Sequence, residues 1–213
     1  MTERMAWPPA QLTLVSGDLE LTPMCDADLP GLIELVLSGI HDPGTTPFIP
    51  PWTDAPADRA PAEFVRHYGR TLFKQVPGAV ALEFAVRVRG TLIEVQGLSG
   101  ENFPLLRTVE TGSWLGLAHQ GQGLGTRMRQ AACAFAFDQL GAERITSHAF
   151  LDNPASRAVS RKVGYRPNGR DWKAPRGAVR EQEVLLLTPE TFVRGEPVVV
   201  SGADEYRAFV GLD

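Results

Sequence analysis

The spacing of hydrophobic and polar residues predicts that strands and helices alternate along this chain. In residues 11–23 apolar positions alternate around Gly17-Asp18, which predicts two short strands joined by a turn. Residues 80–88 and 91–98 predict a hairpin joined at Arg89-Gly90. Further strands are expected at residues 108–117, 144–150 and 183–187, with an edge strand or tail near residues 198–200.

Helical spacing predicts the remaining regular elements. Asp26 is a candidate helix cap, and apolar residues follow it at helical intervals up to Val36. Two more helices are expected over residues 62–74 and 127–140, and the second should bury a stripe of Met128, Ala132, Phe135 and Leu140. Because hairpin strands and separate helices are interleaved, we expect an α/β fold of the α+β type, with a mixed sheet flanked by helices.

The length and charge of the chain limit the classes of protein to which it can belong. A chain of 213 residues with 43% hydrophobic residues suits one domain over residues 1–213, with an N-terminal extension at 1–10 and a C-terminal strand or tail at 195–213. The net charge is -4 and the basic residues are scattered, so neither nucleic acid nor a membrane is an expected partner. No signal core or membrane-length apolar run is seen, which predicts a cytoplasmic protein.

Cysteine and histidine usage does not predict a metal site. Cys25 and Cys133 lie far apart, and the four histidines fall on different expected elements. Cys133 falls inside the predicted helix at residues 127–140, where we expect an inert thiol.

A long polar segment broken by prolines runs from His41 to Arg59. Loops of this length in a compact domain usually have a function or are disordered. Phe48 and Trp52 give this one an apolar edge, so we expect either a role in substrate binding or simple surface cover.

A glycine-rich loop lies between the strand expected at 108–117 and the helix after it. It reads Gln120-Gly121-Gln122-Gly123-Leu124-Gly125-Thr126. Glycines let an anion approach the main chain, and the first N–H groups of the helix point to the same place. This pattern predicts a pyrophosphate site, with an ordinary strand-to-helix turn as the alternative.

The spacing of residues in this loop decides which of three phosphate-binding motifs it fits. A Walker loop needs Lys and then Ser or Thr after its last glycine, but Thr126-Arg127 follows Gly125; a dinucleotide fingerprint needs a glycine where Thr126 stands. The frame that fits is Gln-x-x-Gly-x-Gly. It resembles the pyrophosphate loop of the GNAT superfamily, the acyl-CoA-dependent N-acyltransferases.

A second segment, residues 153–165, strengthens this resemblance. Asn153, Pro154 and Gly164 are typical of the cap, first position and end of a short helix. The order of Asn153, Ser156 and Gly164-Tyr165 also resembles the second half of the GNAT cofactor site. In that family the asparagine side chain bonds the pantetheine arm.

Other segments resemble the RimJ/RimL branch, whose named members acylate N-terminal amines of ribosomal proteins. They are Ser113-Trp114-Leu115-Gly116, Met128-Arg129 and the Asn-x-x-Ser helix. Residues 47–52 and 197–202 also resemble a bacterial subgroup of that branch. The resemblance covers nearly the whole chain and is densest over residues 109–165.

The resemblance implies a sheet whose strands 108–117 and 144–150 splay apart to admit pantetheine. Backbone groups of Ser113 and Leu115 would then bond it. The implied co-substrate is acetyl-CoA, or another acyl-CoA such as succinyl-CoA, without a metal. The residues expected to bind it are Ser113, Leu115, Gln120, Gly121, Gln122, Gly123, Leu124, Gly125, Thr126, Asn153 and Ser156.

The general base has several candidates. Glu110 comes first, because it lies on the strand leading to the glycine-rich loop, although an exposed strand carboxylate is the alternative. Glu94 and Glu83 lie on the hairpin and are substitutes for it. Glu94, with Phe48 and Trp52, is also expected to contact the acceptor.

The proton for the departing thiolate needs a donor. Many GNAT enzymes place a tyrosine seven residues after the asparagine, but that position is Ser160 here. Ser156 resembles the serine that the RimJ/RimL branch offers near the sulfur, with a helix-surface hydroxyl as the alternative. No cysteine is placed to form an acyl-enzyme, which favours direct transfer in a ternary complex.

The sequence therefore predicts an acyl-CoA-dependent N-acyltransferase, most simply an acetyltransferase. The acceptor is an amine on a protein N-terminus, a lysine or a small molecule. A non-catalytic acyl-CoA-binding module and a nucleotide-binding protein are the alternatives. A homodimer is common among the proteins that the chain resembles.

Overall fold

A nine-stranded sheet forms the centre of the computed structural model, which describes residues 7–42, 44–45, 47–49 and 52–212. The strands lie in the order β7-β8-β6-β5-β4-β3-β2-β1-β9. They are β1 Thr13–Ser16, β2 Leu19–Pro23, β3 Val80–Val88, β4 Thr91–Gly100, β5 Thr108–Leu115, β6 Arg144–Phe150, β7 Arg166–Lys173, β8 Arg180–Leu187 and β9 Val199–Ser201. Neighbouring strands are antiparallel except β5 and β6, which are parallel. The predicted mixed sheet is confirmed.

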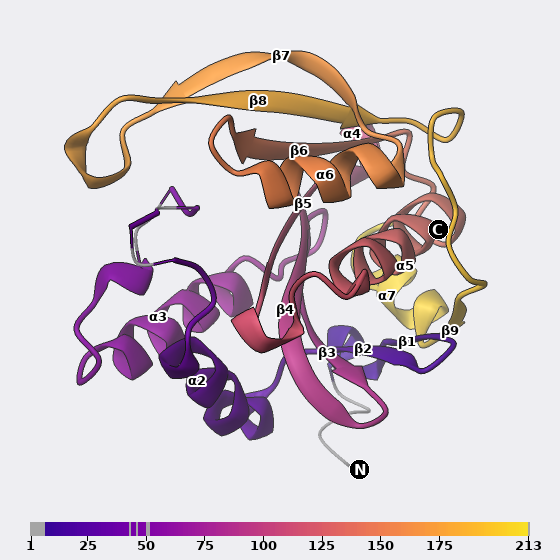
Figure 1. Ribbon diagram of the computed structural model, residues 1–213. Helices are drawn as coiled ribbons and strands as arrows, with labels where there is room; N and C mark the ends of the chain where they lie inside the picture. Colours follow the sequence, from indigo (N-terminus) through magenta and orange to yellow (C-terminus); the bar gives the residue numbers. More distant parts are fainter. Residues whose placement is uncertain (1–6, 43, 46, 50–51, 213) are drawn as a thin grey trace.

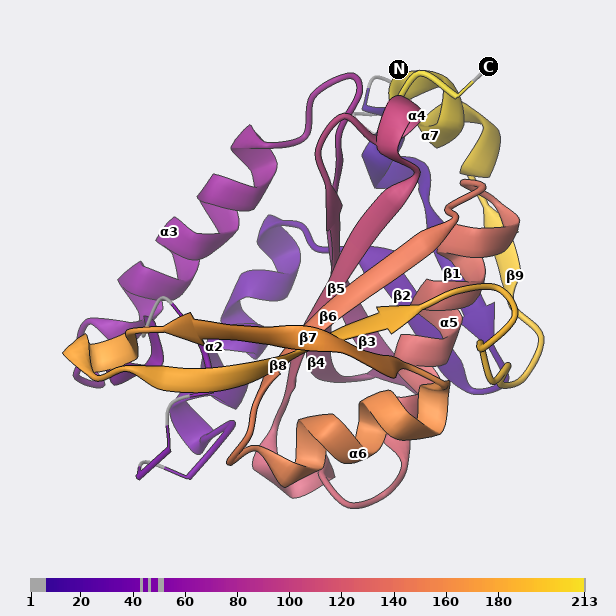
Figure 2. The same ribbon diagram turned by 90° about the horizontal axis from the view of Figure 1, so that it is seen from above.

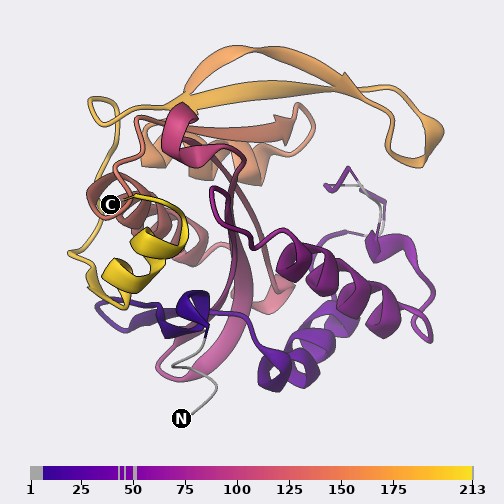
Figure 3. The ribbon, with the colours of Figure 1, turned by 180° about the vertical axis from the view of Figure 1, so that it is seen from behind.

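Helices cover both faces of the sheet (Figures 1 and 3). They are α2 Leu29–Ser38, α3 Ala60–Phe73, α4 Phe103–Leu106, α5 Leu124–Asp138, α6 Pro154–Val163 and α7 Ala203–Phe209. The α2/α3 face buries Phe64, Val95 and Trp114 in one cluster. The α5/α6 face buries a larger cluster that includes Phe84 and Phe135. Within the described ranges, no helix combines the length and apolar character needed to cross a bilayer.

Helix α5 packs on the sheet through the predicted stripe. Met128, Ala132, Phe135 and Leu140 are all buried, and the Phe135 ring meets Phe84 edge-on with centroids 6.2 Å apart. Burying each large apolar side chain contributes about 1.5–3 kcal/mol. The helix begins at Leu124, three residues earlier than predicted, because its first turn continues directly from the glycine-rich loop.

Other elements also differ from the sequence-based expectation. Strand β5 ends at Leu115 rather than residue 117, because a 3₁₀ turn over Leu117–His119 follows. Strand β7 was not expected, since its residues are polar and nearly all exposed. Helix α7 follows β9 in the segment predicted as a strand or tail. The arm formed by β7 and β8 extends past the sheet towards the loop before α3 (Figure 2).

Candidate active site

Strands β5 and β6 separate near the middle of the sheet (Figure 1). They pair only at Thr108–Arg144, Val109–Ile145 and Glu110–Thr146, although β5 continues to Leu115 and β6 to Phe150. The splayed pair implied by the resemblance is therefore present.

Backbone groups of β5 point into this gap. The Ser147 hydroxyl donates to the Thr111 carbonyl across 3.2 Å, so Thr111 faces β6. Alternate residues of a strand direct their hydrogen-bonding groups the same way, so Ser113 and Leu115 also face the gap. This arrangement suits the pantetheine-binding role predicted for both residues.

The glycine-rich loop, residues 120–126, forms an open cradle next to the gap. Gly121 and Gly123 have φ of +75° and +81°, and a Cβ on either would meet nothing within 4 Å. Five consecutive backbone N–H groups, from Gly121 to Gly125, donate to no described residue. At the N-terminus of a 15-residue helix such donors suit an anion.

Side chains of the cradle loop fix its position. The Gln120 amide donates to the carbonyls of Ile40 and Leu115, across 3.0 and 2.9 Å. The Thr126 N–H donates to the Gly123 carbonyl across 3.1 Å. Gln120 therefore ties the cradle to the end of β5, while the unbonded donors lie between Gln120 and Thr126.

Helix α6 forms the other side of the cradle. Asn153 caps it as predicted, since its Oδ1 accepts the Ser156 N–H across 3.1 Å. A Cβ on Gly125 would lie 3.6 Å from Val159, so the first turn of α5 packs closely on α6. Asn153, Ser156 and the cradle are thus brought together by the β6–α6 connection and the α5–α6 contact.

A buried arginine links α5, α6 and β5 behind the gap. Arg129 is 4% exposed and donates to the hydroxyls of Ser160 and Ser113, across 3.1 and 2.8 Å. The sequence motifs do not predict this role; the one signal for it is a charged residue among the buried apolar residues of α5.

Glu94 lies on the α5/α6 face and not beside Phe48 and Trp52. Its side chain is fully buried, and both carboxylate oxygens lack a hydrogen-bond partner among the described residues. Burial raises the pKa of Glu94 well above its ordinary value, and the positive charge of Arg129 opposes that rise. This shift favours the protonated, neutral form of the carboxyl.

On the α2/α3 face, two glycines lie side by side: Gly97 is buried beneath the Glu83 carboxyl, whereas Gly112 is exposed. Glu83, Gly97 and Gly112 are register partners on β3, β4 and β5. A Cβ on Gly97 would lie 3.3 Å from both Glu83 oxygens, whereas one on Gly112 would meet nothing within 4 Å. His148 lies on β6 two residues beyond Thr146, the last β6 residue that pairs with β5, and its ring bonds Glu110. We call Glu83, Gly97, Gly112 and His148 the glycine trough.

The walls of the trough carry titratable groups. Glu83 is 21% exposed, and burial raises its pKa to about 7. His67 Nε2 lies 3.9 Å from Glu83 Oε1, and burial lowers the pKa of His67. On the opposite wall, His148 Nδ1 lies 3.1 Å from Glu110 Oε1, and this hydrogen bond raises the pKa of His148. Glu110 is half exposed.

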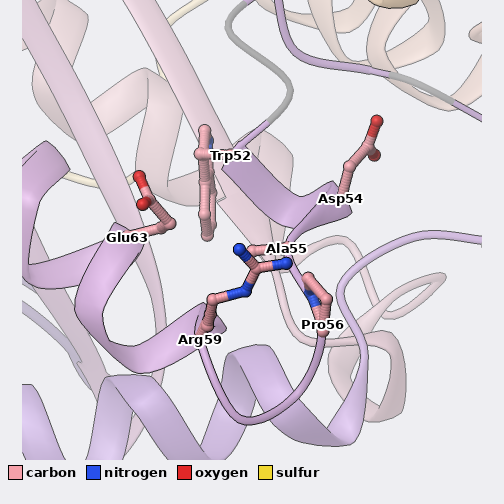
Figure 4. Close-up of a pocket in the computed structure, with 6 residues that line it drawn as sticks. All are labelled: Trp52, Asp54, Ala55, Pro56, Arg59 and Glu63. Carbon is pink, nitrogen blue, oxygen red and sulfur yellow. The ribbon is translucent and has the colours of Figure 1, made fainter.

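The 3₁₀ turn Trp52–Asp54 lies beside the trough. Trp52 stacks on His67, with ring centroids 5.8 Å apart, and also packs against Phe48 and Trp114. Asp54 forms an ion pair with Arg176 at the turn of the β7–β8 arm. Trp52 and Asp54 line a pocket of about 330 Å³ with Arg59 and Glu63 (Figure 4).

The structure resembles solved acetyltransferases. A Mycobacterium smegmatis RimJ in complex with CoA-disulfide is 18% identical, with a TM-score of 0.72 and 94% of each chain covered. A RimL, ribosomal L7/L12 alpha-N-protein acetyltransferase, in complex with coenzyme A is 21% identical, with a TM-score of 0.65, covering 82% of this chain and 96% of that one. A spermidine N-acetyltransferase chimera from Vibrio cholerae and hSSAT is 16% identical, with a TM-score of 0.60, covering 82% and 97%.

The sequence itself matches one protein family. The match is to the acetyltransferase (GNAT) domain and spans residues 18–166, from β1–β2 through α6 to the start of β7. This range contains the separated strands, the cradle and the glycine trough. The chain is therefore a member of the GNAT acetyltransferase family, as its two sequence motifs predicted.

Proposed function

We propose that this acetyltransferase moves an acetyl group directly from acetyl-CoA to a primary amine that enters the glycine trough. One observation carries the proposal: the cradle begins α5 on one face of the sheet, the trough lies on the α2/α3 face, and both are next to the place where β5 and β6 lose their pairing. A donor and an acceptor approaching from opposite faces would meet beside Gly112 and Ser113. Holding both reactants in line supplies much of the rate advantage.

The cradle residues suit the diphosphate of the co-substrate. Each N–H between Gly121 and Gly125 that bonds a charged oxygen contributes roughly 1.5–3 kcal/mol. Backbone groups of Ser113 and Leu115 would bond the pantetheine, with Asn153 and Ser156 beside it. The bound co-substrate supplies the activated acyl group as a thioester.

Glu83 is the residue best placed to accept the proton of the amine. Its carboxyl lies over Gly97, and its pKa of about 7 matches a base that works near neutral pH. An α-amine with a pKa of 7.7–8.0 is about one-tenth neutral at pH 7, so a modest base suffices. Glu110, the first candidate from sequence, bonds His148 instead and is assigned to holding that ring.

Ser156 is assigned to protonating the departing thiolate. It lies in the first turn of α6 and is only partly exposed. An acyl-enzyme through Cys133 is disfavoured, because that thiol is fully buried and burial raises its pKa to about 12. Transfer from donor to acceptor is therefore direct.

Thiol release from acetyl-CoA and from succinyl-CoA tests the proposal. The amines to compare are a peptide with a free N-terminus, the same peptide N-acetylated but containing lysine, and spermidine. We expect acetyl-CoA to react fastest, with release that depends on the amine. Stabilisation by acetyl-CoA without release for any amine would instead indicate a non-catalytic acyl-CoA-binding module and contradict the proposal.

A further inference from the structure

A second hollow of about 930 Å³ opens on the α2/α3 face. Its inner wall includes Ala81, Ser99, Glu110 and Thr146, which are register partners on β3, β4, β5 and β6. Each of them lies two residues along its strand from a member of the glycine trough. Residues i and i+2 of a strand share a face, so the hollow continues directly from the trough.

The outer rim of this hollow is apolar and exposed. Phe73 at the end of α3 is 87% exposed and Leu105 in α4 is 86% exposed, while Leu106 and Val76 are 53% and 48% exposed. Exposed apolar side chains that gather around one hollow are typical of a binding surface. We call the hollow and these four residues the apolar groove.

The rise per residue of a strand gives the distance from Gly112 to the groove. With about 3.3 Å per residue, Glu110 lies roughly 7 Å and Thr108 roughly 13 Å along β5 from Gly112. An extended peptide advances by a similar step for each residue. A peptide with its α-amine at Gly112 therefore brings its third to fifth residues over the groove.

We propose that the apolar groove binds the third to fifth residues of a polypeptide acceptor and favours apolar side chains there. This inference rests on the proposed function, because it uses the trough as the place of the reacting amine. A small polyamine would leave the groove empty, whereas an extended N-terminal segment fills both. Continuity with the trough favours such a peptide over a second copy of this chain.

The test compares two peptides that share their first two residues and carry leucine or aspartate at positions 3–5. With the natural chain, we expect kcat/KM to be roughly tenfold or more higher for the leucine peptide, since each buried leucine favours binding. In the double variant Phe73→Ser, Leu105→Ser this ratio should fall towards one. Val199→Ser, at a 68% exposed position on β9, is the matched control and should keep the ratio.

Two results would overturn the inference. One is an equal ratio in the natural chain and the double variant, measured while amine-dependent thiol release persists. The other is a dimer that becomes a monomer in the double variant by analytical ultracentrifugation, which would make the groove a contact between copies. A chain that releases no thiol with any amine would refute the proposed function instead, so the two failures are distinguishable.

Discussion

The guanidinium of Arg129 donates to the hydroxyl of Ser160 across 3.1 Å, at the position where many GNAT enzymes carry a tyrosine. The other terminal nitrogen of Arg129 reaches Ser113 on β5. The Ser160 hydroxyl is thus engaged in holding α5 against α6 and faces away from solvent. This leaves Ser156, one turn earlier on α6, as the hydroxyl for acid catalysis.

Replacing Arg129 with lysine should destabilise the fold. A lysine keeps the charge but cannot bond two hydroxyls in the fork geometry of a guanidinium, so one buried group loses its partner. We expect the free energy of unfolding in urea to fall by about 1–3 kcal/mol. Arg161→Lys, on the exposed side of the last turn of α6, is the control and should change it by less than about 0.5 kcal/mol.

Gly123→Val should abolish acetyl-CoA binding measured by calorimetry. The φ of +81° disfavours any β-branched residue, and the side chain would occupy the open space in front of the cradle donors. Gly169→Val is a suitable control, because Gly169 also has a positive φ and open surroundings but lies on β7, away from the cradle. Unchanged affinity in Gly123→Val would refute the anion-binding role of the loop.

Glu83→Gln should lower kcat/KM for an α-amine by about 10²–10⁴-fold. The base must be ionised, so activity should rise with pH through a pKa of about 7, and this limb should vanish in the variant. The part of the pH profile that comes from the amine itself, with a pKa of about 7.7–8.0, should persist. If Glu110→Gln rather than Glu83→Gln removes the lower limb, the base is Glu110, as first expected from the sequence.

Ser156→Ala should reduce turnover more than it reduces acetyl-CoA affinity. Its N–H still bonds Asn153, so the helix cap is retained and only the hydroxyl is lost. Single-turnover kinetics and calorimetry separate the two effects. An unaltered rate would remove Ser156 from the acid role.

Glu94 should make stability depend on pH. Its folded-state pKa is raised, so the folded chain keeps a proton that the unfolded chain releases above about 4.3. Stability from this group is fully present below that value and falls by about 1.4 kcal/mol per pH unit above it, until the folded-state pKa is reached. Glu94→Gln should flatten this decline, measured by urea unfolding as the pH is raised above 5; an unchanged slope would assign it to another group.

Local patterns predicted the parts of the site that are local in sequence. The cradle glycines and the helix from Asn153 to Gly164 depend on turn and cap chemistry, which neighbouring residues determine. The glycine trough joins Glu83, Gly97, Gly112 and His148 from four strands, and only the register of those strands brings them together. Strand β7 escaped prediction because its exposed residues lack an apolar alternation.

The separation of β5 from β6 also affects the stiffness of the sheet. Among the described residues, three residue pairs join the strands β7, β8 and β6 to the six other strands. An acyl-CoA bound between β5 and β6 would add hydrogen bonds between these two parts of the sheet. It would thereby stiffen the place where the amine binds. The weak pairing of β5 and β6 therefore favours binding of the acyl-CoA before the amine.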